Sequence, residues 1–129
     1  MIFIMPKLRR TCFDSMQSFG KKGEDLAVEF LERAGYLILD RNFRYKRSEI
    51  DIICSREGLL IFVEVKSRSS KAFGQPETFV SKSQEQSILQ AAEAYMIEDN
   101  WQGDIRFDII AIYKKGEFEE IEHFQDAFY

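Results

Sequence analysis

The feature that most constrains the fold is a pair of apolar segments joined by a three-residue connection. Residues 49–55 and 59–67 are rich in Ile, Val, Leu and Phe, which favour β-strands. Gly58 ends the connection, and glycine readily adopts the positive φ that a tight hairpin turn requires. On the second segment one face is wholly apolar, whereas the other changes from apolar near the turn to charged at the far end. We therefore expect a β-hairpin that is buried near its turn and opens into charged groups beyond it.

Apolar residues at helical spacing predict two helices, one at residues 23–34 and one at about 81–98. Further β-strands are expected at 37–43 and 105–113, with a possible last strand at 118–124. The order is α-β-β-β-α-β, with the possible extra C-terminal strand. This order indicates an α/β protein with a mixed central β-sheet that is flanked by helices.

The composition agrees with one domain that has a real core. The chain has 129 residues, of which 45% are hydrophobic. No apolar run approaches the ~20 residues that span a bilayer. The basic residues near the start follow the first apolar residues, whereas in a signal peptide they precede them. We therefore expect a cytoplasmic protein without a membrane partner.

Cysteine and histidine are too few for a zinc site. The two cysteines, Cys12 and Cys54, do not suggest a disulfide framework, and His123 is the single histidine. A four-ligand site of Cys and His cannot be assembled from them. We expect Cys54 to be buried as a small hydrophobe and His123 to lie on the surface near the chain end.

The charge is unevenly distributed along the chain. Residues 1–83 carry 15 Lys and Arg against 11 Asp and Glu, whereas residues 84–129 carry 3 against 11. Phosphate binding depends on local positive charge, so the basic half gives weak support for a polyanionic partner. Charge alone favours the alternative, which is ordinary solvated surface.

The expected hairpin register places charged groups together at its open end. A turn centred between residues 57 and 58 sets Asp51 opposite Glu64, and Glu49 opposite Lys66, all on one face. Directly opposed Cβ atoms are ~4.5–5.5 Å apart, so both carboxylates can reach one Mg²⁺ or Mn²⁺ ion. Such an ion can activate a water, while Lys66 can position or deprotonate that water or stabilise developing charge. The alternative is a cross-strand salt bridge without function.

Two helix residues border the apolar stripes and can point inward. Glu24 precedes the stripe of the first helix, and Gln84 precedes Ile88 at the start of the second. The alternatives are favourable placement of an acid near a helix N-terminus for Glu24 and a solvated first-turn position for Gln84. Together with the hairpin, the two residues complete a candidate catalytic site.

Several stretches of the chain match a known pattern: GKKGEDLAVEFLERAGYLILDRNFR, SEIDIICSREGLLIFVEVKSR, FGQPETFV, AAEAYM and RFDIIAI. Over roughly residues 20–112 the chain resembles the YraN-like family of small bacterial proteins. That family is related in fold to Holliday-junction resolvases and restriction endonucleases of the PD-(D/E)xK type. The resemblance implies metal ligation by Asp51 and Glu64, catalysis by Lys66 and an accessory role for Glu24. Ser48 stands where a glycine is usual, and Gln84 stands about where a lysine is common.

The expected function is Mg²⁺-dependent or Mn²⁺-dependent phosphodiester hydrolysis in DNA, with branched or junction DNA among the candidate substrates. The alternatives are a non-catalytic nucleic-acid-binding or DNA-processing accessory protein, and a protein-interaction domain that uses the acidic end of the chain. A homodimer is left open. Basic residues beside the hairpin are expected to contact nucleic acid: Arg41, Arg44, Lys46, Arg47 and Arg68.

The chain is divided into an N-terminal extension (1–15), a nuclease-like domain (16–116) and an acidic tail (117–129). Two interpretations of the extension stay open. In one, translation begins at Met16 and the extension is not part of the native protein. In the other, it is an arm whose apolar tip packs on this or a neighbouring molecule, so that truncation lowers stability.

Overall fold

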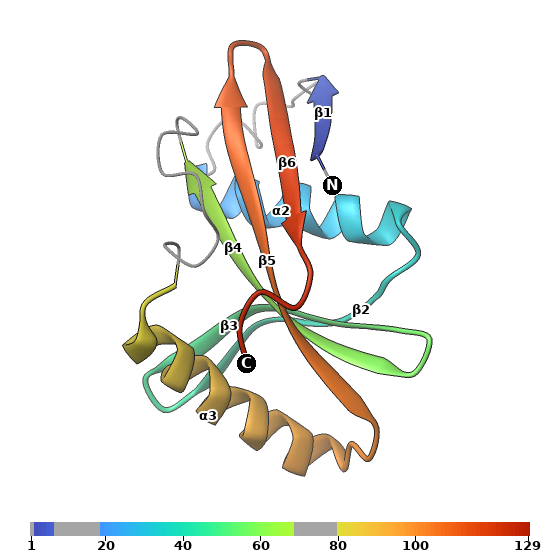
Figure 1. Cartoon of the computed structure of the whole chain (residues 1–129), viewed down its shortest axis with the longest axis vertical. Helices are drawn as coiled ribbons and strands as arrows, with labels where there is room; N and C mark the ends of the chain where they lie inside the picture. The colour runs from blue at the N-terminus through green and yellow to red at the C-terminus, as the bar shows by residue number, and fades with distance from the viewer. Residues whose placement is uncertain (1, 7–18, 69–79) are drawn as a thin grey trace.

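Six β-strands form one mixed sheet in the computed structural model, which describes residues 2–6, 19–68 and 80–129 (Figure 1). The strand order across the sheet is β1-β6-β5-β4-β3-β2. Strands β4 and β5 are parallel, and all other neighbours are antiparallel. The bounds are β1 Ile2–Pro6, β2 Leu37–Tyr45, β3 Ser48–Arg56, β4 Leu59–Arg68, β5 Asp104–Lys115 and β6 Phe118–Phe124. The α/β class, the mixed sheet and the last strand are thus confirmed.

Two helices cover opposite faces of the sheet, as Figure 1 shows. Helix α2 spans Phe19–Arg33 and helix α3 spans Lys82–Asp99. Ser81 caps α3 by accepting a hydrogen bond from the Gln84 backbone N–H, which fixes where the helix begins. Gly35, with φ of 93°, follows the end of α2 as the sequence predicts. In the described part of the chain, neither helix is long and apolar enough to cross a membrane.

The hairpin between β3 and β4 has the predicted turn and register near its tip. Glu57 and Gly58 both have positive φ (52° and 80°), as a two-residue hairpin turn requires. Ile53 pairs with Phe62, but the ladder ends at the pair of Ile52 and Val63.

The predicted pairs of Asp51 with Glu64, and of Glu49 with Lys66, are therefore wrong as ladder pairs. The physical reason is that the Asp51 carboxylate takes the place of a backbone carbonyl of β3 as the hydrogen-bond acceptor at this position. It accepts the hydrogen bond of the Val65 N–H at 2.8 Å.

The core has two parts, one on each face of the sheet. Leu26, Ala27, Phe30 and Leu31 of α2 pack on β3, β4 and β5, while Ile88, Ala91 and Ala92 of α3 pack on the other face. Cys54 is fully buried in the first part, as expected, and burial raises the pKa of its thiol to about 12. Its thiol is thus a packing group and not a nucleophile at neutral pH.

Both ends of the described chain join the sheet. Strand β1 pairs with β6, so that Phe3 lies beside Ile121. Residues 7–18, which include Cys12 and Met16, lie outside the described residues. Residues 117–129, predicted as an acidic tail, contribute β6 and a final segment whose Ala127 N–H donates to the Phe107 carbonyl at 2.7 Å. Strand β6 thus belongs to the same sheet as β5, and the division of the chain at residue 117 stays a prediction.

Candidate active site

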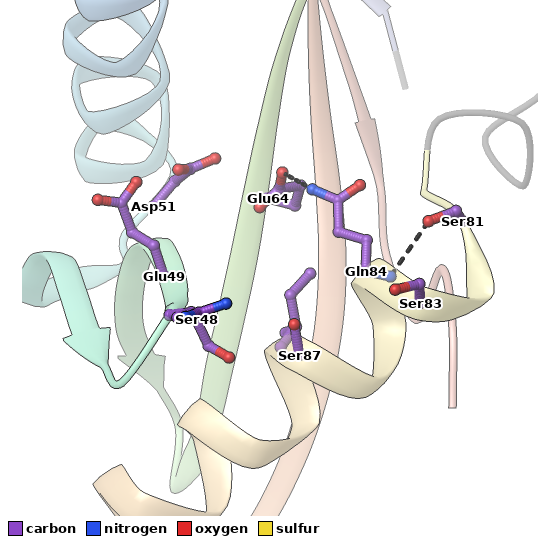
Figure 2. Close-up of a pocket in the computed structure, with 10 residues that line it drawn as sticks. Ser48, Glu49, Asp51, Glu64, Ser81, Ser83, Gln84 and Ser87 are labelled. Carbon is purple, nitrogen blue, oxygen red and sulfur yellow. Dashed lines mark hydrogen bonds between the residues drawn. The ribbon is translucent and has the colours of Figure 1, made fainter.

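The candidate site lies where β3 and β4 separate, beyond the last pair of their ladder. Asp51 comes from β3, Glu64 and Lys66 from β4, Gln84 from the first turn of α3 and Glu24 from α2. In Figure 2, Asp51 and Gln84 flank the Glu64 side chain from opposite sides. Four separate elements thus bring the predicted polar residues to one end of the hairpin.

Gln84 links the two β4 residues. Its Nε2 donates to Glu64 Oε2 at 2.7 Å, and its Oε1 accepts from Lys66 Nζ at 3.4 Å. The Lys66 ammonium also lies 3.1 Å from the same Glu64 oxygen, and the Glu64 side chain is only 9% exposed. The prediction that Gln84 points inward is confirmed, and the solvated alternative is wrong. Each of these hydrogen bonds joins the neutral Gln84 amide to a charged group, Glu64 or Lys66. Such bonds are stronger than neutral ones, and they fix the rotamers of Glu64 and Lys66.

Asp51 is a strongly perturbed carboxyl group. Burial, followed by the negative charge of Glu64, raises its pKa from 3.8 to about 7, although the hydrogen bond from Val65 N–H acts in the opposite direction. Near neutral pH both the protonated and the ionised form of Asp51 are therefore populated. The part of this rise that comes from Glu64 reflects charge repulsion, which a bound cation would relieve.

Glu24 adds to this negative potential from the side of α2. Burial and the charge of Asp51 raise the pKa of Glu24, while a hydrogen bond from Asn42 and the charge of Arg41 lower it. Arg41 lies 3.9 Å from Glu24 but only 2.7 Å from Asp25, and the latter is its closer ion pair. Glu24 thus lies close enough to Asp51 for the two charges to interact, and the N-terminal half of α2 borders the site.

A polar cavity of about 330 Å³ adjoins Glu64 and extends between β3 and α3 (Figure 2). Its two walls are the start of β3 and the first two turns of α3. The lining residues are Arg47, Ser48, Glu49, Asp51, Glu64, Ser81, Ser83, Gln84, Ser87 and Ile88. Asp51 and Glu64 thus border a space in which a ligand can sit.

The donor set fits a hard divalent cation that retains water ligands. In the described ranges no three His, Cys, Asp or Glu residues are grouped closely enough to form a closed metal site. Mg²⁺ is commonly bound through one or two carboxylates, with water and substrate phosphate completing its coordination. Asp51 and Glu64 would supply such a pair of oxygen ligands, and the pKa of Asp51 is raised first by burial and then by the negative charge of Glu64.

The five basic residues predicted to contact nucleic acid lie in different surroundings. Arg47 lines the cavity, whereas Arg44 pairs with Glu49 at 3.1 Å and Lys46 lies over the Tyr45 ring. Arg41 is bound to the acids of α2, and Arg68 donates to the Ser67 carbonyl at the end of β4. Only Arg47 among them lines the cavity, and contact of the group with nucleic acid stays a prediction.

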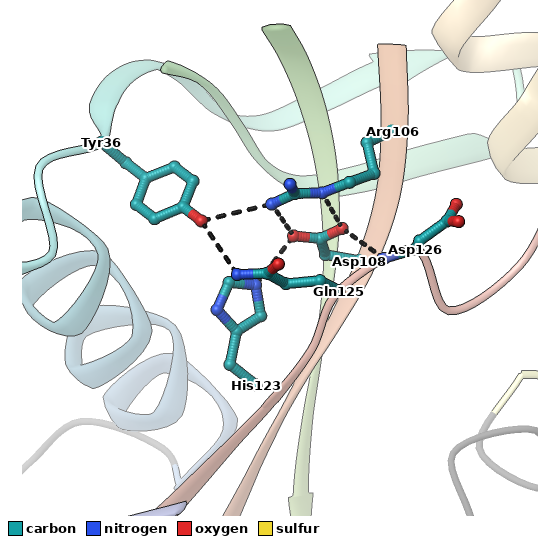
Figure 3. Close-up of polar contacts among 6 residues, drawn as sticks. All are labelled: Tyr36, Arg106, Asp108, His123, Gln125 and Asp126. Carbon is teal, nitrogen blue, oxygen red and sulfur yellow. Dashed lines mark hydrogen bonds and ion pairs between the residues drawn. The ribbon is translucent and has the colours of Figure 1, made fainter. Parts of the chain in front are cut away.

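A second polar cluster, centred on Asp108, was not predicted from the sequence. Asp108 is fully buried and accepts hydrogen bonds from Nε and Nη2 of Arg106, from the Asp126 N–H and from His123, which lies 2.8 Å away (Figure 3). Burial alone would raise the pKa of Asp108, but the bonds from His123, Arg106 and Asp126 hold it below its usual value. The Arg106 guanidinium also donates to the Tyr36 hydroxyl.

The surface position predicted for His123 is therefore wrong, because His123 is 8% exposed and binds Asp108. The cluster joins β5, β6 and the segment that follows α2. It lies on the α2 side of the sheet, away from Glu64, which contacts α3. We interpret it as a structural network.

Comparison with known sequences agrees with the matches described above. The profile of the uncharacterised protein family UPF0102 matches residues 23–112. A UPF0102 protein of Flavobacterium psychrophilum is 50% identical over 110 residues, which cover 85% of this chain and 92% of that protein. A UPF0102 protein of Flavobacterium johnsoniae is 50% identical, over 85% of this chain and 93% of that protein. A UPF0102 protein of Syntrophotalea carbinolica is 43% identical, over 86% of this chain and 91% of that protein. The resemblance to the YraN-like family is confirmed, and the chain belongs to family UPF0102.

Proposed function

We propose that this protein is a metal-dependent nuclease that hydrolyses phosphodiester bonds in DNA, branched or junction DNA included. The observation that carries the proposal is the grouping of Asp51, Glu64 and Lys66 beside a polar cavity. The proposal includes kinship of the fold with restriction endonucleases of the PD-(D/E)xK type. That kinship is supported by the antiparallel hairpin of β3 and β4, followed by helix α3 and by β5, which runs parallel to β4, with the acids at the open end of the hairpin.

Asp51 and Glu64 would hold Mg²⁺ or Mn²⁺. When bound, the ion supplies a water of lowered pKa and stabilises negative charge on a phosphoryl oxygen. The chain itself contributes the orientation of its side chains. Gln84 holds Glu64 through one amide atom and Lys66 through the other, so the carboxylate and the ammonium stay together.

Lys66 has the chemistry of a group that acts on the reacting atoms. Its side chain is 16% exposed, and its ammonium lies beside Glu64 at the same end of β4. It can hold the attacking water or stabilise charge on the phosphate, because it is a compact cation with three donors. While protonated it is not a metal ligand, so its role is separable from metal binding.

One observation favours the alternative of a non-catalytic nucleic-acid-binding accessory protein. Lys66 and Glu64 already form an ion pair at 3.1 Å, which neutralises one of the two carboxylates without a metal. A protein that keeps the fold for binding alone would be stable in this form. Cleavage and binding must therefore be measured separately.

The test is a cleavage panel of linear duplex, single-stranded, flap and four-way DNA with Mg²⁺ or Mn²⁺. We expect cleavage by the wild type and none by Asp51→Asn, with Asp104→Asn, an exposed aspartate at the start of β5, as the control. Calorimetry with Mn²⁺ should show binding that Asp51→Asn weakens. Equal Mn²⁺ binding by wild type and Asp51→Asn would overturn the metal assignment. Failure of the wild type to cleave any substrate, together with retained DNA binding, would favour the accessory function.

A further inference from the structure

The part of the cavity beyond Asp51 and Glu64 is not used by the proposed chemistry. Its walls carry a guanidinium from Arg47, hydroxyl groups from Ser48, Ser83 and Ser87, and the carboxylate of Glu49. That carboxylate is paired with Arg44 at 3.1 Å. Figure 2 shows Ser48 on the β3 side, facing Ser83 and Ser87 on α3. Ser83 and Ser87 are four residues apart, so both lie on the same face of the helix.

Ser48 has an unusual environment for a serine. The residue as a whole is only 6% exposed, and its hydroxyl is not among the enclosed side-chain atoms of the described residues that lack a hydrogen-bond partner. A serine hydroxyl beside a cavity can donate a hydrogen bond to water or to a ligand. Because Ser48 lines the cavity, a ligand held there is within reach of this hydroxyl.

The lining chemistry distinguishes between two parts of a nucleic acid. Unpaired bases are held by stacking on aromatic rings or by apolar contacts, yet no aromatic residue is found among the described residues that line the cavity. Ile88 is the apolar residue in this set. Guanidinium and hydroxyl groups, by contrast, are the donors that proteins direct at backbone phosphates.

We propose that this cavity is a phosphate subsite that holds a backbone phosphate next to the bond to be cleaved. Arg47 supplies the positive charge, and Ser48, Ser83 and Ser87 supply hydrogen bonds. The subsite rests on the proposed nuclease function, since Asp51 and Glu64 at its other end repel a phosphate unless a divalent cation joins them. Recognition through this subsite carries no base information, so the substrate is bound through its backbone and without sequence preference.

The experiment measures DNA binding by fluorescence anisotropy, in Mg²⁺ and in EDTA, on a Lys66→Ala background that prevents turnover. The probes are two flap oligonucleotides of equal length and different sequence. Arg47→Gln should weaken binding to both probes about tenfold in Mg²⁺ and lower the slope of log affinity against log salt by about 1. A variant without the hydroxyls, Ser48→Ala/Ser83→Ala/Ser87→Ala, should weaken binding about fivefold and leave the slope unchanged.

Arg56→Gln is the matched control, because Arg56 is exposed at the opposite end of β3 and packs over Tyr36. It should leave affinity and salt slope at the values of the background protein. If the background protein binds DNA but the Arg47 and serine variants bind equally well, the subsite is wrong and the nuclease proposal stands. A change in preference between the two sequences would indicate base recognition and overturn the subsite. Absence of any DNA binding, with no cleavage in the panel, would overturn both proposals.

Discussion

Asp51→Asn should make the metal-free protein more stable above neutral pH. In the unfolded chain an aspartate ionises near its usual pKa of 3.8, but in the folded protein Asp51 ionises at about 7. Between these values the folded state binds more protons than the unfolded state, so stability falls as pH rises through this window. Below it, both states are protonated and the group contributes no pH dependence.

The size of the effect follows from the shift. Each pKa unit corresponds to about 1.4 kcal/mol, so a shift of about three units lowers the wild-type free energy of unfolding by up to about 4 kcal/mol between about pH 4 and about pH 8. Asparagine is neutral at every pH, and its amide oxygen can still accept the hydrogen bond from Val65 N–H. We therefore expect Asp51→Asn to match the wild type near pH 4 and to exceed its stability increasingly as pH rises.

The assay is urea denaturation in EDTA at a series of pH values, followed by circular dichroism. Asp104→Asn makes the same chemical change on an exposed aspartate at the other end of the sheet and should follow the wild type. Added Mg²⁺ should then stabilise the wild type more than Asp51→Asn, because binding to the folded state alone raises stability. A constant difference between Asp51→Asn and wild type across the pH range would show that charge repulsion at Asp51 is not the cause.

Three further changes test other parts of the structure. Lys66→Ala should abolish DNA cleavage while calorimetry still detects Mn²⁺ binding; undiminished turnover would remove Lys66 from the mechanism. Gly23→Ala should lower the free energy of unfolding by about 1–3 kcal/mol, because the new Cβ would lie 2.2 Å from the buried Ser67 Oγ. In a Ser67→Ala background the same change should be stabilising, because the next atoms are 3.6 Å from the new Cβ and alanine favours a helix more than glycine does. A lower free energy of unfolding in both backgrounds would contradict the clash with Ser67. Asp108→Asn should cost about 2–5 kcal/mol in urea denaturation, because it leaves Arg106 without its carboxylate, and a loss below about 0.5 kcal/mol would show that the network contributes little.

The hairpin could be predicted because its signals are local. The apolar alternation and the residues at the turn determine the pairing from Arg56 with Leu59 up to Ile53 with Phe62, next to the last pair of the ladder. The separation of the strands beyond Ile52 could not be predicted in this way. It depends on Asp51 taking the place of a backbone acceptor for Val65, and that contact joins residues 14 positions apart.

His123 was misjudged for a similar reason. A lone histidine among acidic residues resembles a surface residue when only its neighbours in sequence are considered. Its environment depends instead on β6 pairing with β5, which sets His123 beside Ile110 and within reach of Asp108. The order of strands on that side of the sheet, where β1 also pairs with β6, is a non-local property that strand periodicity does not contain.

The hydrogen bond from Val65 to Asp51 gives the protein a reporter of its own. A backbone N–H on a central strand usually donates to a neighbouring strand and does not sense ionisation, whereas this one donates to a carboxylate that titrates near neutrality. Its amide proton resonance should therefore move as Asp51 loses its proton and move again when a cation takes the proton's place. A single peak in a nitrogen-15 correlation spectrum can thus follow occupancy of the site, without a substrate and without a label in the cavity.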